Sequence, residues 1–314
     1  MGRRRRLGKE VAVTSPTTIP EEEFAHPGST GCPGCGANLV MRYMLKGLGE
    51  RTIISIPACC WAVMPGYWPS HCLKVPLVYS AFEATGASIS GIRAALDMRG
   101  EEDVTVVGFA GDGGTVDIGL QALSGAAERR TDAIYVMYDN EAYMNTGIQR
   151  SGSTPWGAWT TTTPVGSDRA FKREPKKDIM AIMEAHGIPY AATVSVGHPE
   201  DFVKKMRKAR DVRGFSFIHA FSPCPPGWRM DPMKTIEVAK LAVDTRVFPL
   251  YEIDDGELTI TREGKGKPVS EYLSLQGRFR HLSEEDVADI QVDVDARYAA
   301  LKARVAKKAS KDDE

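Results

Sequence analysis

The chain has 314 residues, 42% of them hydrophobic, which is enough for one large α/β domain or two modest ones with a sizeable core. Its 40 basic and 41 acidic residues leave a formal net charge of −1, so the overall charge indicates no nucleic-acid partner. No apolar segment follows the run Arg3–Arg6, which we interpret as a solvated tail. No segment approaches the roughly 18 apolar residues of a membrane span. These features predict a soluble, cytoplasmic protein that contacts neither nucleic acid nor membrane.

Strands and helices alternate over most of the chain. Residues 1–30, with three prolines, are predicted to form an irregular N-terminal arm. Short β-branched or apolar runs predict strands at 52–56, 75–79, 104–109, 133–138, 190–196 and 214–221. Amphipathic or small-residue segments predict helices at 37–48, 85–98, 117–129, 176–186 and 199–211. This order predicts an α/β fold with a doubly wound, mostly parallel sheet.

The segments after this alternation have a different character. Residues 145–168 lack periodicity, and a loop of that length inside a compact domain is usually functional. Near the C-terminus we expect a helix at 234–245, a β-hairpin around Asp254–Gly256 and a charged helix at 284–309. The predicted organisation is an arm at 1–30, a ligand-binding domain at 31–232, and a C-terminal helix, hairpin and helical tail at 233–314.

Glycines and oxygen-bearing side chains follow two of the predicted strands. The strand at 104–109 runs into Gly111–Gly114, whose glycines permit a tight turn and let backbone N–H groups approach phosphate oxygens. The next strand ends before Asn140. Asp112, Asn140 and the backbone carbonyl of Ala142 are oxygen ligands of the kind that Mg²⁺ prefers. The combination predicts a site for a diphosphate and its magnesium ion beyond the carboxyl ends of the strands.

The six cysteines do not resemble a secreted disulfide framework, since the chain is long and two of them are adjacent. Cys32 and Cys35 form a Cys-X-X-Cys pair, for which a metal site or redox chemistry is the ordinary interpretation in a reducing compartment. Zinc is one candidate, because four cysteines suit it as well as an iron–sulfur cluster. Cys59 and Cys72 are interpreted as small buried hydrophobic residues, although Cys59 remains an alternative to Cys60 as a ligand.

Three segments together resemble one enzyme family. They are GCPGCGAN near Cys32, GDGGTVDIGLQALSGAAER from Gly111, and YDNEAYMNTGIQRSGSTPWGAWTTTTP from Tyr138. In these motifs the chain resembles the thiamine-diphosphate-binding β subunit of the 2-oxoacid:ferredoxin oxidoreductases, the family of pyruvate synthase. The likeness runs from about Cys32 to Trp228, and it implies the thiamine-diphosphate-binding fold.

The resemblance also implies roles for particular residues. Asp112, Asn140 and the Ala142 carbonyl would bind Mg²⁺. Gly111, Gly113, Gly114 and Thr146 would lie against thiamine diphosphate. Asn145 would face the reactive ring as the catalytic residue, and the loop 148–164 would help to close the site. Cys32, Cys35, Cys60 and Cys224 would hold a 4Fe–4S cluster.

The resemblance implies that this chain works with others. The glutamate that activates thiamine would come from another subunit, while Glu141 is expected to be structural. A ferredoxin-like subunit would carry further clusters, and ferredoxin would accept the electrons. The chain looks closest to the β subunit of oxalate oxidoreductase, so the expected reaction is oxidation of oxalate to carbon dioxide, with pyruvate oxidation to acetyl-CoA as the alternative. A non-oxidative thiamine enzyme and a zinc-stabilised scaffold without catalysis are the remaining alternatives.

Overall fold

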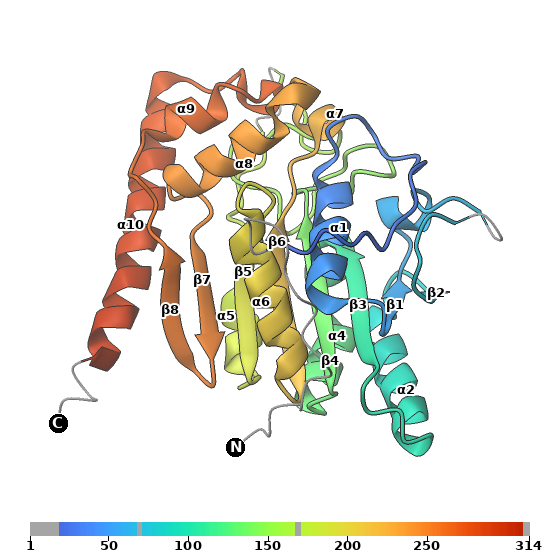
Figure 1. Cartoon of the computed structure of the whole chain (residues 1–314). Helices are drawn as coiled ribbons and strands as arrows, with labels where there is room; N and C mark the ends of the chain where they lie inside the picture. The colour runs from blue at the N-terminus through green and yellow to red at the C-terminus, as the bar shows by residue number, and fades with distance from the viewer. Residues whose placement is uncertain (1–18, 68–70, 167–170, 310–314) are drawn as a thin grey trace.

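The fold is centred on one eight-stranded sheet (Figure 1). The computed structural model describes residues 19–67, 71–166 and 171–309. The strand order is β2-β1-β3-β4-β6-β5-β7-β8. The β5–β7 and β7–β8 pairs are antiparallel, and the other neighbouring pairs are parallel. The strands are β1 Thr52–Ile56, β2 Leu77–Tyr79, β3 Thr105–Gly111, β4 Ala133–Asp139, β5 Tyr190–Ser195, β6 Phe215–Phe221, β7 Leu250–Asp254 and β8 Glu257–Arg262.

Helices pack on both faces of the sheet. The α-helices are α1 Gly36–Leu48, α2 Thr85–Met98, α3 Asp112–Val116, α4 Leu120–Glu128, α5 Ile179–Ala185, α6 Pro199–Asp211, α7 Pro225–Trp228, α8 Thr235–Asp244, α9 Val269–Leu273 and α10 Glu284–Ala309. Three short 3-10 helices are η1 Cys60–Ala62, η2 Pro232–Lys234 and η3 Gly277–Phe279. Among the described residues, no helix is both long and apolar enough to cross a membrane.

Alternation along the buried strands builds two apolar cores. In β3, Val107 and Phe109 join the core beneath α1, α6 and α8, whereas Val106 and Ala110 join the core beneath α2, α4 and α5. Successive side chains of a strand point to opposite faces, so a strand that is buried on both faces must be apolar throughout. This arrangement confirms the doubly wound, mostly parallel sheet that the sequence predicts.

Most predicted elements are present with ends shifted by one to three residues, and the helices at 85–98, 199–211 and 284–309 have the predicted bounds. The helix predicted at 117–129 is present as α4, but it begins only at Leu120, after a separate short helix, α3. The chain forms α3, breaks at Asp117 with φ −115° and ψ −95°, and resumes as α4. The backbone after this break requires glycine at position 119, because a Cβ there would lie 2.0 Å from the carbonyl oxygen of Gly114.

The described part of the N-terminal arm lies along α1. The buried Lys46 donates hydrogen bonds to the carbonyl oxygens of Pro20 and Glu22, at 2.7 and 3.0 Å. Residues 1–18, including Arg3–Arg6, lie outside the described residues. The C-terminal hairpin extends the same sheet, because β7 pairs with β5.

Candidate active site

The carboxyl ends of β3 and β4 bring the predicted oxygen ligands together. The two strands are adjacent and parallel, with Gly111 opposite Tyr138. The residues that follow them, Asp112 and Asn140, therefore lie side by side at one edge of the sheet. We call Gly111–Gly114 and Asn140–Ala142 together the diphosphate site.

Three oxygen atoms converge in the diphosphate site. Oδ1 of Asn140 faces only acceptors, 2.9 Å from Oδ1 of Asp112 and 3.0 Å from the carbonyl oxygen of Ala142. With the amide turned over, its nitrogen would instead donate a hydrogen bond to each of these oxygens. Oxygen atoms at such distances repel one another unless a proton or a cation lies among them. A carboxylate, an amide oxygen and a backbone carbonyl are the donor set that a hard divalent cation takes, so these residues fit Mg²⁺.

Asp112 is the buried carboxyl of this set. It is 1% exposed, and its Oδ2 accepts a hydrogen bond from the Ser151 hydroxyl. Burial and the nearby Asp139 carboxylate raise the pKa of Asp112 well above its ordinary value. A divalent cation beside it would offset both effects and favour the charged form.

Gly113 and Gly114 make room for aromatic rings. A Cβ on Gly113 would lie 2.2 Å from Cε1 of Tyr143, and one on Gly114 would lie 3.1 Å from Cε2 of Phe82. The Tyr143 ring also packs edge-on against Phe82, and its hydroxyl donates to Oδ2 of Asp117 at 3.0 Å. The glycines are thus required at least as much for packing as for the approach of a phosphate.

Asn145 and Thr146 are exposed residues of a tight turn between Tyr143 and Gln149. The turn is closed by a hydrogen bond from the Tyr143 amide to the Gln149 carbonyl at 2.9 Å. The Thr146 hydroxyl donates to Oε1 of Gln149 at 2.6 Å. Ile148 has φ +66°, a strained conformation for a β-branched residue that often marks a functional segment. The loop 148–164 follows without a helix or strand.

Beneath the diphosphate site lies a buried set of charged residues that the sequence did not identify. We call it the ion-pair network; its members are Asp139, Glu141, Lys176, His219 and Arg278. Asp139 Oδ2 lies 2.6 Å from Lys176 Nζ and 2.7 Å from His219 Nε2. Glu141 lies 2.9 Å from Lys176 and 2.5 Å from Arg278. Glu141 is therefore held by two cations, in agreement with the structural role expected for it.

The four cysteines expected to be ligands approach one another from three segments. We call Cys32, Cys35, Cys60 and Cys224 the cysteine site. The Cys32–Cys35 turn rests on the segment before Cys224, since the amide of Gly36 donates to the Pro223 carbonyl at 3.0 Å. Next to Cys60, the Trp61 indole donates to the Ala37 carbonyl of α1 at 3.0 Å. No three His, Cys, Asp or Glu side chains are arranged to hold a metal ion directly within residues 19–67, 71–166 and 171–309.

In the absence of a metal ion, burial and mutual repulsion disfavour the deprotonated form of the thiols in the cysteine site. Burial raises the pKa of the Cys60 thiol strongly, and the neighbouring cysteines add to the effect. Burial also raises the pKa of Cys224 to about 12, with further contributions from Cys35 and Cys32. A bound metal ion would favour the thiolate form at these positions.

The Cys59 thiol contacts different residues from those around the neighbouring Cys60 thiol. It shares a hydrogen bond with the Tyr138 side chain and another with the backbone of Gly111, and burial raises its pKa. Cys59 thus lies against the diphosphate site. Cys72 is buried in the apolar core, in agreement with its interpretation as a small hydrophobic residue.

The diphosphate site and the cysteine site are neighbours. A Cβ on Gly227 would lie 2.2 Å from Sδ of Met144 and 3.3 Å from Sγ of Cys224. Met144 belongs to the turn that follows Ala142. The two sites therefore meet at Met144 and Gly227.

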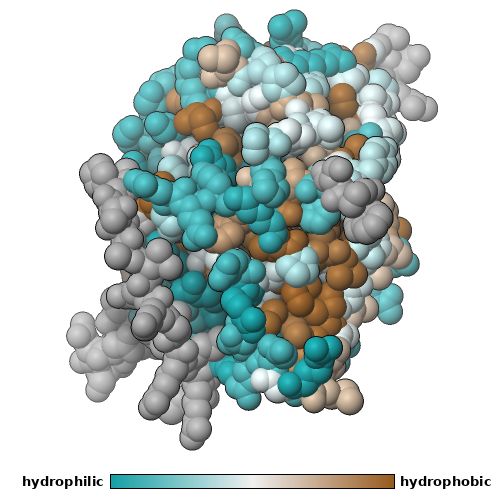
Figure 2. All heavy atoms as spheres, turned by 45° about the vertical axis from the view of Figure 1, so that its right-hand side comes forward, coloured by the Kyte–Doolittle hydropathy of each residue, from teal (hydrophilic) through white to brown (hydrophobic). Residues whose placement is uncertain are grey.

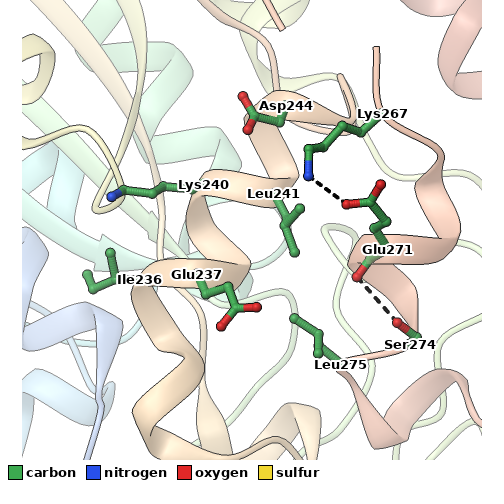
Figure 3. A pocket seen from close by; sticks show the side chains of 9 residues that line it. All are labelled: Ile236, Glu237, Lys240, Leu241, Asp244, Lys267, Glu271, Ser274 and Leu275. Atoms are coloured by element: carbon green, nitrogen blue, oxygen red, sulfur yellow. Dashed lines mark hydrogen bonds and ion pairs between the residues drawn. The ribbon is translucent and has the colours of Figure 1, made fainter. Parts of the chain in front are cut away.

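A separate groove lies between α8 and α9, with a volume of about 620 Å³ (Figure 3). None of the predicted site residues line it. Its charged side chains have partners, such as Lys267 with Glu271 at 2.7 Å and Asp244 with Lys265 at 2.8 Å. We assign no ligand to this groove.

Comparison with known proteins identifies the family of this chain. Residues 59–220 match the thiamine pyrophosphate enzyme C-terminal TPP-binding domain. The chain is 52% identical over 293 residues to ketoisovalerate oxidoreductase subunit VorB of Pyrococcus furiosus, covering 91% of this chain and 94% of that protein. It is 53% identical over 279 residues to pyruvate synthase subunit PorB of Methanothermobacter marburgensis, covering 88% and 97%. The chain is a β subunit of the 2-oxoacid:ferredoxin oxidoreductase family.

The family membership confirms the resemblance described above, the oxidoreductase class and a thiamine-diphosphate-binding domain. The fold agrees with 2-oxoglutarate:ferredoxin oxidoreductase from Magnetococcus marinus, with a TM-score of 0.56 and 22% identity over 73% of this chain and 84% of that one. The expected closeness to oxalate oxidoreductase is not supported by these relatives, which are named for ketoisovalerate and pyruvate. The pyruvate alternative fits them better than the oxalate expectation does.

Proposed function

We propose that this β subunit takes part in the oxidative decarboxylation of pyruvate, binding thiamine diphosphate through Mg²⁺ in the diphosphate site and a 4Fe–4S cluster in the cysteine site. The observation that carries the proposal is the approach of the Asn140 side-chain amide to the Asp112 carboxylate and the Ala142 carbonyl, with Cys224 close by across Met144 and Gly227, in a chain of this family.

In the diphosphate site, Asp112, Asn140 and the Ala142 carbonyl would hold the metal ion, and Gly111, Gly113, Gly114 and Thr146 would lie along the cofactor. Thiamine diphosphate, when bound, supplies the electron sink that allows a 2-oxoacid to lose carbon dioxide. The exposed Asn145 would orient substrate at the surface where a partner subunit completes the site. The loop 148–164 would exclude water from that surface.

In the cysteine site, Cys32, Cys35, Cys60 and Cys224 would hold the cluster that takes electrons one at a time. Cys60 is proposed in preference to Cys59, because Cys59 is already engaged by Tyr138 and Gly111. The proximity of Met144 to Cys224 supports direct electron transfer between the two sites.

Pyruvate is the proposed substrate, and 2-ketoisovalerate is the second candidate. Both choices come from relatives of nearly equal similarity, at 53% and 52% identity. Each substrate has an apolar group next to its 2-oxoacid, unlike the second carboxylate of oxalate. Oxalate would require additional cations facing that carboxylate.

Partner subunits are proposed to supply the activating glutamate and the further clusters that lead to ferredoxin. The relatives are named as subunits of oxidoreductases. Figure 2 shows an apolar region on the side that carries β1, β2 and α2. On these elements, Val78 and Tyr79 of β2 and Met98 of α2 are 41, 51 and 91% exposed. Large exposed apolar regions commonly mark protein interfaces.

The experiment is ferredoxin reduction by the anaerobically purified complex. Pyruvate, 2-ketoisovalerate and oxalate are compared, each with and without coenzyme A, while bound thiamine diphosphate is measured in the same preparation. We expect the fastest reduction with pyruvate and coenzyme A. Faster reduction with 2-ketoisovalerate would select the second candidate, and a preparation without thiamine diphosphate and iron would contradict the proposal altogether.

A further inference from the structure

We propose that Arg278, from the C-terminal segment, is a positioning residue that sets the geometry of the metal-binding peptide Asn140–Ala142. The inference rests on the proposed function of the diphosphate site. It assigns a part in cofactor binding to a residue well outside the matched domain, which ends at residue 220.

The Arg278 side chain is placed to act on this peptide. It is 2% exposed, and its guanidinium donates a hydrogen bond to Oε2 of Glu141 at 2.5 Å. It also donates to Oε1 of Gln276 at 2.8 Å. Removal of a fully buried arginine that bonds a buried carboxylate is costly, and here it would leave Lys176 to balance both Glu141 and Asp139.

Glu141 requires such restraint because its backbone is strained. Its φ is +67°, which is unfavourable for a residue with a Cβ. Such a conformation persists where its surroundings over-determine it. Here the Glu141 amide donates to Oδ1 of Asp139 at 3.0 Å, its carbonyl accepts from Thr154 at 2.7 Å, and its carboxylate is held by Arg278 and Lys176. This conformation turns the next carbonyl, that of Ala142, toward Asn140 and Asp112.

A second contact reaches the same peptide through Trp228. The Arg278 guanidinium lies over the Trp228 ring, 3.9 Å from its centre. The indole Nε1 of Trp228 in turn donates to the backbone carbonyl of Asn140 at 2.8 Å. Arg278 therefore restrains the residue on each side of the Asn140–Glu141 bond.

The Arg278 backbone joins two further parts of the site. Its carbonyl accepts a hydrogen bond from the Trp159 amide at 2.9 Å, within the loop 148–164. Trp228 ends the short helix α7 that begins directly after Cys224, and its amide donates to the Cys224 carbonyl at 2.8 Å. One residue thus connects the metal-binding peptide, the closing loop and the cysteine site.

In the test, the purified complex is first dialysed to remove its bound metal ion and thiamine diphosphate. Mn²⁺ is then added in the presence of thiamine diphosphate, and its binding is measured by electron paramagnetic resonance. Arg278→Gln keeps a planar polar group but loses the charge. We expect it to weaken Mn²⁺ binding by about 10- to 100-fold, the usual effect of removing a residue that supports metal ligands. Arg278→Lys restores the charge but not the planar stacking, so it should recover part of the affinity.

Arg229→Gln is the matched control. Arg229 also stacks on a tryptophan, 3.4 Å from the centre of Trp159, but it is exposed and makes no contact with Glu141. Its substitution should leave Mn²⁺ binding unchanged. A purely structural role for Arg278 would lower thermal stability without selectively weakening Mn²⁺ binding.

Trp228→Phe keeps the proposal testable if Arg278→Gln does not fold. It retains an aromatic ring under Arg278 but removes the donor to Asn140, and it should weaken Mn²⁺ binding several-fold. Wild-type affinity in the folded Arg278→Gln variant, or in Trp228→Phe where only that variant folds, would overturn the inference. A wild-type complex that binds neither Mn²⁺ nor thiamine diphosphate would instead overturn the proposed function on which it rests.

Discussion

The diphosphate site and the cysteine site lie side by side but are built in different ways. The proposed ligands of the first come from two segments at the ends of hydrogen-bonded strands, so the register of β3 against β4 places them. The proposed ligands of the second come from positions up to about 190 residues apart, in the segments that follow β1 and β6 and just before α1. β1 and β6 are separated in the sheet by β3 and β4. The cysteine site therefore depends on tertiary packing that spans several strands.

Because the two sites are built from different segments, we expect a substitution in one site to remove its cofactor while the other site keeps its own. The largest effect should come from Asp112→Ala, which removes the only carboxylate among the three proposed metal ligands. Thiamine diphosphate binding should weaken by more than about 100-fold, since loss of a residue that merely supports a ligand costs about 10- to 100-fold. Iron content should be unchanged. Wild-type thiamine content in this variant, measured after gel filtration, would remove Asp112 from the metal site.

Cys60→Ser should have the opposite pattern. We expect the variant complex to lose about four irons per copy of this chain while retaining thiamine diphosphate, because a 4Fe–4S cluster needs four thiolates. Cys59→Ser and Cys72→Ser are the controls, and each should retain its iron. Iron loss from Cys59→Ser but not from Cys60→Ser would exchange the two assignments.

A smaller effect is expected at Gly113. In Gly113→Ala the added methyl would meet the Tyr143 ring, and overpacking of this kind costs about 1–3 kcal/mol. The displaced ring should weaken thiamine diphosphate binding several-fold without changing the iron content. Gly166→Ala is the matched control, since within the part of the chain that the structure describes no atom lies within 4 Å of the added methyl. Equal binding by the two variants, measured by equilibrium dialysis, would show that the ring does not support the site.

The smallest effect concerns acid stability. Burial alone would raise the pKa of Asp139, but Lys176 and His219 lower it overall below the ordinary value of 3.8. The ion pairs therefore stabilise the fold above pH 3.8, and this contribution is lost as the pH falls through the lower pKa of the folded state. Asp139→Asn should unfold with a weaker dependence on pH in this range, followed by circular dichroism. An unchanged dependence would mean that other carboxyl groups govern acid unfolding.

The sequence predicts the regular elements of the fold better than it predicts the contacts between distant segments. The sheet and most helices follow from local periodicity, and the adjacency of Asp112 and Asn140 follows from strand order. The break at Asp117 between α3 and α4 does not, because no pattern in the sequence marks it or the close approach of Gly119 to the Gly114 carbonyl beside it. Lys176 and Arg278 were missed for the same reason. Glu141 and Arg278 are far apart in the sequence, in segments with no shared motif, and only the folded structure brings them together.

The central claim is that electrons pass from the diphosphate site to the cysteine site within this chain. The most direct test adds pyruvate and coenzyme A to the anaerobic complex without ferredoxin and follows bleaching of the iron–sulfur absorbance. We predict bleaching in the wild-type complex and none in complexes that carry Asp112→Ala or Cys60→Ser. Bleaching of wild-type extent in the Cys60→Ser complex would contradict the account, because it would mean that electrons leave the diphosphate site by another route.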